Sequence, residues 1–237
     1  MLNLECTVLR FSVGFIFPCC KKNFRLPPKI LIFAKNYKLP KEKISIIDYK
    51  AGNIKSVEAA LQRLGCQTIL TKSHDIIKSA DKVIFPGVGN AGAAMEALRA
   101  EKLDVLIPTL RQPVLGICLG MQLMCRHSEE ENTDALGIFD VDVVKFVPKN
   151  GEKIPQMGWN QIFGLRTPLY DGVDENSFVY FVHSYMVPVF DGTAAKCDYT
   201  VQFSASIAKN NFYGTQFHPE KSGVVGHKIL ENFLKIL

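Results

Sequence analysis

Residues 113–125 read Pro-Val-Leu-Gly-Ile-Cys-Leu-Gly-Met-Gln-Leu-Met-Cys. The apolar first half of this stretch predicts a buried parallel strand, and the second half predicts the helix that follows it. Cys118 stands at the corner, and Gly116 and Gly120 lie two residues from it on either side. This is the spacing of the nucleophile elbow Gly-x-Ser-x-Gly, with a thiol in place of the hydroxyl. The stretch therefore predicts an α/β fold with a nucleophile at the carboxyl end of a parallel strand.

The position of Cys118 suits a reactive thiol. The first N–H groups of a helix and the positive end of its dipole favour the thiolate. The flanking glycines leave room for a turn that larger side chains would block. The alternative interpretation is a buried cysteine that packs as a small apolar residue. A nucleophile also needs a general base and a group that orients the base.

A candidate base lies in residues 211–220, Asn-Phe-Tyr-Gly-Thr-Gln-Phe-His-Pro-Glu. His218 and Glu220 are two residues apart in an extended segment, so their side chains leave the backbone on the same side. Pro219 between them ends the pairing of the strand. With Cys118 they form a hypothetical triad of thiolate, proton carrier and orienting carboxylate. An ordinary turn at the end of a strand is the alternative.

The composition is that of a globular protein, with 47% hydrophobic and 22% charged residues in a chain of 237, and we expect one folded domain. The net charge of +5 is uneven: residues 1–42 contain eight Lys or Arg and two acids, whereas the remaining 195 contain 20 and 21. The neutral domain argues against a nucleic-acid partner. The seven cysteines lack metal-ligand spacing, so we expect no metal, free thiols and a cytoplasmic, reducing compartment.

Residues 1–42 differ from the rest, and we expect a disordered or non-native extension ahead of a domain at 43–237. The apolar run at 11–20 is too short to span a bilayer, so we expect no membrane partner. It has the length of a signal-peptide core, but Pro-Cys-Cys-Lys at 18–21 is a poor cleavage site. An organellar presequence would be richer in Arg and Ser.

From residue 43 onward the pattern alternates between strand and helix. Apolar runs at 44–47, 66–70 and 82–85 predict strands, and the amphipathic residues 56–64 predict a helix. This alternation predicts a mostly parallel central sheet with helices on both faces. In such folds, sites lie at the carboxyl ends of the strands.

A glycine-rich loop, Pro-Gly-Val-Gly-Asn-Ala-Gly at 86–92, follows the third of these strands, and we expect a helix from about Ala93. Its glycines permit backbone conformations in which N–H groups point at an anion. Phosphate binding is one use, but the dinucleotide fingerprint belongs after the first strand. Beside a thiolate elbow, an oxyanion hole is the better interpretation.

The second half of the chain is β-rich and predicts an added antiparallel region. His183 fits a hydrogen-bonded structural histidine better than a second base, and the acidic run 128–131 alone fits a solvated helix end. The expected elements are strands at 141–147, 159–163 and 178–187, a hairpin of 201–207 and 212–217 that delivers His218, and an amphipathic helix at 224–237.

Five stretches together resemble the class I, or triad, glutamine amidotransferases over about residues 43–237. Within that family they are similar to the glutaminase subunits of imidazole glycerol phosphate synthase, an enzyme of histidine biosynthesis. His-Pro-Glu and the elbow mark the family, whereas Pro-Gly-Val-Gly and Met-Gly-Trp-Asn mark the branch. The stretches are Asp48-Tyr49-x-x-Gly52-Asn53, Pro86-Gly87-Val88-Gly89, Gly116 to Gln122, Pro155-x-Met157-Gly158-Trp159-Asn160 and Gly214 to Ser222.

The resemblance implies a class I glutamine amidotransferase fold and hydrolysis of glutamine through a thioester at Cys118. It implies that His218 carries the proton, that Glu220 orients His218, and that no cofactor takes part. Three residues would form the oxyanion hole after a flip of the loop peptide, with N–H donors from the last two: Gly87, Val88 and Leu119. The positions matched to glutamine binding are Gln122, Glu130, His183, Ser184 and Tyr185.

The same resemblance implies a heterodimer in which ammonia passes to a (β/α)8-barrel cyclase subunit. That subunit would make imidazole glycerol phosphate and an aminoimidazole-carboxamide ribotide, and glutaminase activity would be low until it and its ligand bind. Lys50, Asn90-Ala91 and the basic tail depart from the family pattern, which bears on the partner more than on the triad. The face toward the partner would carry Asn53, Trp159, Tyr180 and Lys221.

Other functions stay open at this point. A paralogous glutaminase that feeds ammonia to another synthase, such as an amino-sugar enzyme, would share the triad and differ at Lys50 and Asn53. A catalytically silent interaction subunit is the alternative of another class, although a scaffold needs no intact Cys118, His218 and Glu220. An unrelated elbow hydrolase fits less well, because such enzymes place the acid before the histidine.

Overall fold

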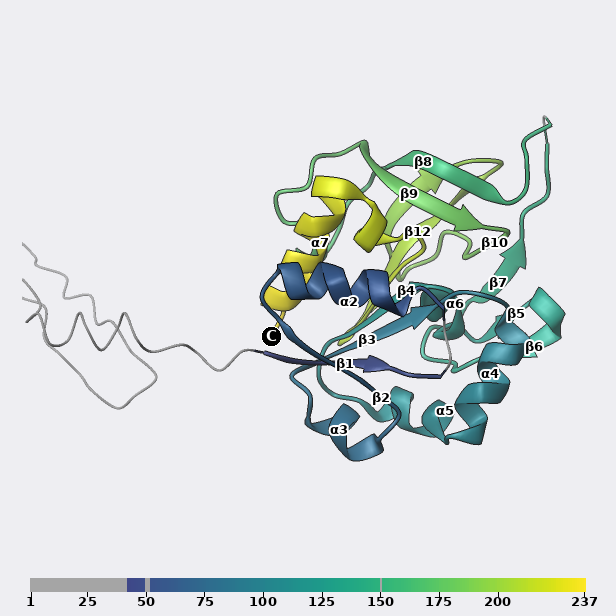
Figure 1. Ribbon diagram of the computed structural model, residues 1–237. Coiled ribbons are helices and arrows are strands. Elements are labelled where there is room, and N and C mark those ends of the chain that lie inside the picture. The colour runs from purple at the N-terminus through teal and green to yellow at the C-terminus, as the bar shows by residue number, and fades with distance from the viewer. Residues whose placement is uncertain (1–41, 50–51, 150) are drawn as a thin grey trace, which may run out of the picture. The chain divides into compact units, whose positions relative to one another are not determined.

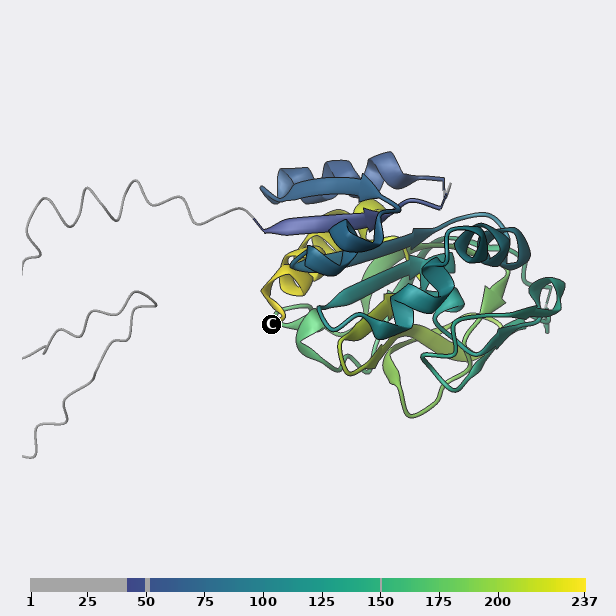
Figure 2. The same cartoon turned by 90° about the horizontal axis from the view of Figure 1, so that it is seen from below.

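The computed structural model describes residues 42–49, 52–149 and 151–237 (Figures 1 and 2). The prediction of a disordered or non-native extension at 1–42 falls, except for Glu42, outside the described residues. Lys50, one of the departures from the family pattern, also falls outside them.

A seven-stranded sheet forms the centre of the molecule. Its strands in chain order are β1 (Lys43–Ile47), β2 (Gln67–Thr71), β3 (Lys82–Gly87), β4 (Val114–Cys118), β11 (Thr193–Asp198), β12 (Gln202–Lys209) and β13 (Phe212–Thr215). They lie in the spatial order β11-β12-β13-β4-β3-β1-β2. The neighbours from β13 to β2 are parallel, and β12 is antiparallel to both β11 and β13. The predicted, mostly parallel sheet is confirmed.

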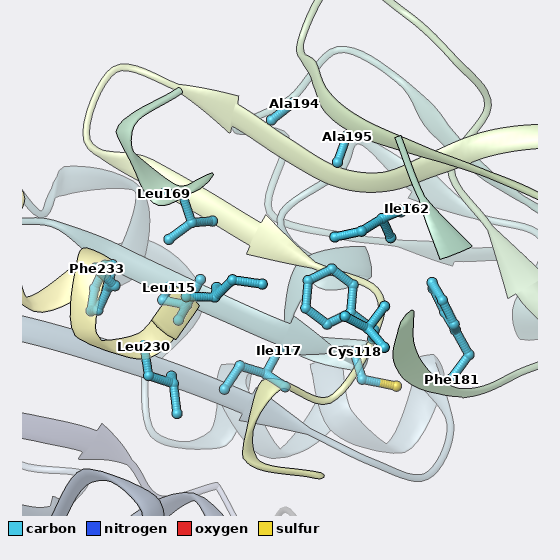
Figure 3. Packing of buried hydrophobic residues seen from close by; sticks show 14 of the residues in the cluster. Leu115, Ile117, Cys118, Ile162, Leu169, Phe181, Ala194, Ala195, Leu230 and Phe233 are labelled. Atoms are coloured by element: carbon cyan, nitrogen blue, oxygen red, sulfur yellow. The ribbon is translucent and has the colours of Figure 1, made fainter. Parts of the chain in front are cut away.

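Helices cover both faces of this sheet, as predicted (Figure 1, Figure 2). On one face, Leu115 and Ile117 of β4 belong to the same buried cluster as Leu230 and Phe233 (Figure 3). On the other face, Val114 belongs to a second cluster that includes residues of four helices. The helices of the first face are α2 (Ile54–Arg63) and α7 (Gly223–Lys235), and those of the second are α3 (His74–Ser79), α4 (Ala91–Ala100), α5 (Leu103–Leu106) and α6 (Leu119–Leu123).

The two faces follow from the alternation of side chains along each strand. In β4, all five residues are buried, so the strand lacks a polar side and is covered twice. In α7, Ile229, Leu230 and Phe233 form a buried stripe at helical spacing. Burial of a side chain such as Phe233 stabilises the fold by roughly 1.5–3 kcal/mol.

The β-rich half adds two smaller sheets. One has the order β10-β7-β5-β6, and the other is the antiparallel pair β8-β9. Their strands are β5 (His127–Ser128), β6 (Thr133–Asp134), β7 (Asp142–Lys145), β8 (Gln156–Ile162), β9 (Ser177–His183) and β10 (Tyr185–Met186). Short 3-10 turns connect elements at η1 (Ile107–Thr109), η2 (Glu130–Asn132), η3 (Pro168–Tyr170) and η4 (Pro219–Lys221).

Two expected elements differ from the structure, and a third is confirmed. The single strand expected at 178–187 is divided at Ser184, because β9 pairs with β8 whereas β10 pairs with β7. The helix expected from Ala93 begins at Ala91, because Oδ1 of Asn90 accepts the N–H of Ala93 and caps it. The predicted hairpin is confirmed as β12-β13, and its second strand pairs with β4 in the central sheet.

Candidate active site

Cys118 ends β4 and immediately precedes α6, and its backbone has φ 55° and ψ −111°. A positive φ is costly for a residue with a side chain, so the surroundings must hold this corner in place. Gly120 makes the corner possible, because a Cβ there would overlap the carbonyl oxygen of Phe85. A Cβ on Gly116 would lie 2.5 Å from Cε of Met124. The two glycines of the elbow thus stand where the backbone leaves no room for a side chain.

The strand order of the central sheet brings His218 and Glu220 close to Cys118. Because β13 lies parallel to β4, the residues after β13 leave the sheet at the same edge as Cys118. Nδ1 of His218 donates to Oε1 of Glu220 at 2.8 Å, and these side chains are 1% and 0% exposed. The structure therefore brings the three residues of the hypothetical triad together.

The Glu220 carboxylate accepts from a second donor. Asn53, which precedes α2 with φ 61°, donates its Nδ2 to the same Oε1 at 2.6 Å. Oε2 of Glu220 is buried and has no hydrogen-bond partner among the described residues. The family resemblance implies a place for Asn53 on the partner face, and in the structure its amide donates to the buried carboxylate beside His218.

The pKa of His218 is set by opposing effects. Burial lowers it, but the nearby Cys118 and the hydrogen-bonded carboxylate of Glu220 outweigh burial and raise the pKa to about 9. Nε2, the ring nitrogen that Glu220 leaves unused, is buried. An imidazolium in this place can give a proton to a group bound next to Cys118 and can take one back.

A cavity of about 300 Å³ lies beside Cys118 and His218. This volume is at the lower end of the range for small-molecule sites, so the cavity suits a ligand of amino-acid size. Predicted site residues in its lining are Val88, Cys118, Leu119, Gln122, Glu130, His183, Ser184, Tyr185 and His218. The sequence missed three others, of which the first two lie in quoted motifs: Gly89, Pro155 and Val182.

Two buried amides stand behind the thiol. Nε2 of Gln122 donates to the carbonyl oxygen of Tyr185 at 2.9 Å and to Oε1 of Gln216 at 2.8 Å. Nε2 of Gln216 in turn lies 3.8 Å from Sγ of Cys118. The sequence missed Gln216, although it stands two residues before His218 in an extended segment, a spacing that places both side chains on one side.

Comparison with known families agrees with this arrangement. The family model described as glutamine amidotransferase class-I matches residues 45–237. That match includes the elbow, the His218–Glu220 pair and every residue of the cavity lining. The chain is a class I glutamine amidotransferase.

This glutamine amidotransferase has relatives that are similar over nearly their whole length. It is 58% identical over 195 residues to the imidazole glycerol phosphate synthase subunit HisH of Bacteroides thetaiotaomicron, a match that covers 82% of this chain and 100% of the relative. It is 46% identical over 197 residues to the subunit of the same name from Escherichia coli K12, covering 81% and 99%.

Solved structures show the same fold. A protein of Thermoplasma acidophilum described as a GMP synthase subunit has a TM-score of 0.64 at 22% identity, covering 83% of this chain and 94% of that one. PurLQS from Thermotoga maritima has a TM-score of 0.62 at 16% identity, covering 83% and 99%. At these identities the likeness concerns the fold alone.

His183 lines the cavity of the amidotransferase, but both of its ring nitrogens are in use. Nδ1 lies 2.7 Å from the carbonyl oxygen of Tyr185, and Nε2 lies 3.0 Å from Oε1 of Gln156. Burial lowers the pKa of His183 to about 4, so the ring is neutral at pH 7. The hydrogen-bonded histidine expected from the sequence is what the structure shows.

The acidic run is not a solvated helix end. Oε2 of Glu130 accepts the N–H of Ala91 at 2.8 Å, and Oε1 of Glu131 accepts from Nδ2 of Asn90 at 2.6 Å. Burial raises the pKa of Glu130. The two carboxylates hold the N-terminus of α4, where negative charge is favourable, and so anchor the glycine-rich loop that precedes it.

That loop runs beside the thiol. Gly87 is the register partner of Cys118 between β3 and β4, and Val88 and Gly89 continue into the cavity lining. Tyr49 donates its hydroxyl to the carbonyl oxygen of Pro86 at 2.7 Å and so holds the start of the loop. The roles of Gly87, Val88 and Leu119 in an oxyanion hole stay a prediction.

Three of the four predicted partner-face residues gather on the outer face of β8-β9. Trp159 is 55% exposed, and its ring meets that of Tyr180 edge to face at 6.0 Å. Nζ of Lys221 lies 6.0 Å from the centre of the Tyr180 ring. Met157 and Phe178 are exposed on the same face, so this surface is apolar around one cation.

The described residues lack the features of two other classes of site. Within them, no three His, Cys, Asp or Glu side chains gather as a metal site. No helix in that part of the chain is long and apolar enough to cross a membrane.

Proposed function

We propose that this chain hydrolyses glutamine to glutamate and ammonia, with Cys118 as the nucleophile. One observation carries the proposal. Cys118, with its strained backbone, and the buried His218–Glu220 pair lie beside one cavity of amino-acid size. The sequence identity of this chain to synthase subunits of two bacteria supports the proposal independently.

The proposed reaction has two halves. The Cys118 thiolate attacks the side-chain carbonyl carbon of glutamine, and the carbonyl electrons move onto oxygen, where the N–H groups of Val88 and Leu119 would receive them. His218 gives its proton to the amide nitrogen, the C–N bond breaks, and ammonia leaves a γ-glutamyl thioester. Water, deprotonated by His218, then cleaves the thioester to glutamate and restores the thiolate.

The lining of the cavity supports glutamine as the ligand. The Glu130 carboxylate offers a counter-charge for the α-ammonium group, and Ser184 and Tyr185 line the cavity at the break between β9 and β10. Gln122 and His183 shape the wall instead of donating to the ligand, because their donor hydrogens are already bound within the protein.

The ammonia would pass to a (β/α)8-barrel cyclase subunit in a heterodimer of histidine biosynthesis. The relatives are named as subunits of imidazole glycerol phosphate synthase, which favours this partner over an amino-sugar synthase. The apolar face of Trp159, Tyr180 and Phe178 lies on β8-β9, and Val182 on β9 also lines the cavity. A partner seated there would therefore lie close to the ammonia. Cys118, Cys125 and Cys197 are free thiols, which suits the cytoplasm as the compartment.

The experiment is glutamate release from glutamine by the purified chain, alone and with a barrel cyclase plus its nucleotide ligand. We expect a large rise with the cyclase, and a fall of about a thousandfold or more in Cys118→Ala, which should still bind the cyclase. Undiminished turnover in Cys118→Ala would refute the nucleophile. Background turnover in both conditions would refute the partner.

A further inference from the structure

The buried side of the Cys118 sulfur is formed by an amide that no motif assigned. Gln216 has no exposed surface, and Gln122 is 5% exposed. We propose that Gln216 donates an N–H to the thiolate of Cys118 and thereby helps to keep the nucleophile charged, with Gln122 as the positioning residue that orients Gln216. The inference deepens the proposed function, since it concerns the same thiol.

The orientation of Gln216 follows from a chain of hydrogen bonds with one fixed end. The carbonyl oxygen of Tyr185 can only accept, so the group that Gln122 turns toward it must be the NH₂. The second N–H of that NH₂ points at Gln216, which must present its oxygen. The NH₂ of Gln216 is thereby turned toward Sγ of Cys118, 3.8 Å away. Rotating either amide by half a turn would set like groups against each other.

The sulfur has one partner for each of its protonation states. A neutral thiol can donate to the carbonyl oxygen of Val182, which lies 3.8 Å from Sγ. A thiolate cannot use that carbonyl, but it can accept from Gln216. Hydrogen bonds that involve a charged group are the stronger kind, and this one is buried. Loss of the Gln216 donor therefore penalises the thiolate more than the thiol, whose sulfur is only a weak acceptor.

Other groups also act on this sulfur. His218, with Glu220 behind it, acts from the segment after β13, and Tyr49 acts from the end of β1. His183 on β9 and Glu130 on η2 line the same cavity. All of them remain in a variant at position 216, so a change in that variant reports the amide. The Tyr49 hydroxyl donates to the carbonyl oxygen of Pro86. Burial raises the pKa of Tyr49, so it stays neutral near pH 7.

The test is the pH profile of alkylation of Cys118 by iodoacetamide in the full chain, without glutamine or a partner. Fragmentation of the peptide in tandem mass spectrometry distinguishes Cys118 from Cys125, which is buried and whose alkylation reports unfolding. In Gln216→Leu we expect the midpoint of the Cys118 profile to rise by about one pH unit. A midpoint equal to that of the parent chain would overturn the proposal.

The hydrogen bond from Gln122 to Gln216, which we call the relay, gives a second, independent outcome. Gln122→Leu frees Gln216 to rotate, so we expect a smaller shift in the same direction. The double variant should shift no more than Gln216→Leu alone, because Gln122 acts only through Gln216. Additive shifts would refute the relay. Asn232→Leu removes a buried amide that donates to Leu169 and Asp171, and it should leave the midpoint unchanged.

These readouts separate the inference from the function on which it rests. Alkylation needs no substrate, so a shifted midpoint in a chain without glutaminase activity would uphold the amide and refute the function. Glutaminase activity with an unshifted midpoint would do the reverse.

Discussion

Two histidines line one cavity, and the protein leaves one of them neutral and the other charged at pH 7. His183, on β9, has its pKa lowered to about 4, whereas His218, after β13, has its pKa raised to about 9. Both are buried, with 7% and 1% of their surface exposed. Burial alone would lower both pKa values, so burial does not explain the difference.

The partners of each ring explain it. His183 meets only neutral groups, a backbone carbonyl and the amide of Gln156, and its ring packs near Phe146, Phe181 and Phe203. His218 meets the carboxylate of Glu220 and the thiol of Cys118. A charged neighbour therefore decides which histidine carries a proton at neutral pH, and the proton carrier can be recognised by its partner.

The largest expected effect is on turnover. His218→Gln removes the proton carrier, so we expect kcat/KM for glutamine to fall by about a thousandfold or more, which corresponds to roughly 4 kcal/mol of barrier. His183→Gln keeps a neutral polar group in the cavity lining, and we expect kcat/KM to fall about tenfold or less. Glutamate release with saturating partner measures both.

Circular dichroism on both variants shows whether the fold is intact. Equal losses of turnover in two folded variants would contradict the assignment of different roles to the two histidines. A greater loss for His183→Gln would reverse the assignment.

The second effect is on stability in acid. The folded-state pKa of His183 lies below the value of about 6.5 expected in the unfolded chain, so the unfolded state binds more protons between about pH 4 and 6.5. Stability from this histidine is complete above pH 6.5 and is lost as the pH falls toward 4, by roughly 3 kcal/mol.

Urea unfolding at a series of pH values measures that loss. In His183→Phe, which cannot titrate, the profile should be flatter by that amount across the same window. An unchanged slope would show that folding does not lower the pKa of His183, and the contrast between the two histidines would fail.

Much of the fold could be predicted because it depends on local pattern. The apolar runs at 44–47 and 82–85 and the glycine spacing around Cys118 each report a strand or a corner that the chain forms by itself. The break at Ser184 could not be predicted, because β9 and β10 continue one apolar run and differ only in the strands that pair with them. Pairing between distant segments leaves no mark on the run itself.

The same limit applies to the site. Cys118, His218 and Glu220 were found because their spacing in sequence corresponds to a geometry. Gln216 and Asn53 act through hydrogen bonds between side chains 98 and 167 residues apart, which spacing does not encode. Asn53 was therefore assigned by resemblance to a partner face, and the structure adds a contact with Glu220 that the resemblance did not imply.

The smallest of these effects tests that contact and sharpens the contrast between the histidines. In Asn53→Gly the carboxylate of Glu220 loses a donor at 2.6 Å, and glycine accepts the φ of 61° without strain. With one donor fewer, the carboxylate is more basic and less fixed. We therefore expect the pKa of His218 to rise further and kcat to fall about tenfold, which corresponds to about 1.4 kcal/mol.

Imidazole ¹⁵N chemical shifts across a pH series measure the first change, and glutamate release with bound partner measures the second. Asn160→Gly is the matched control, because Nδ2 of Asn160 donates to the backbone of Asp198, away from the cavity. If Asn53→Gly weakens partner binding and leaves the pKa of His218 unmoved, Asn53 belongs to the partner face alone. A rise in that pKa with partner binding intact shows that the charge on His218 depends on Asn53 as well as on Glu220 and Cys118. A neutral amide would then help to set the pKa of the proton carrier.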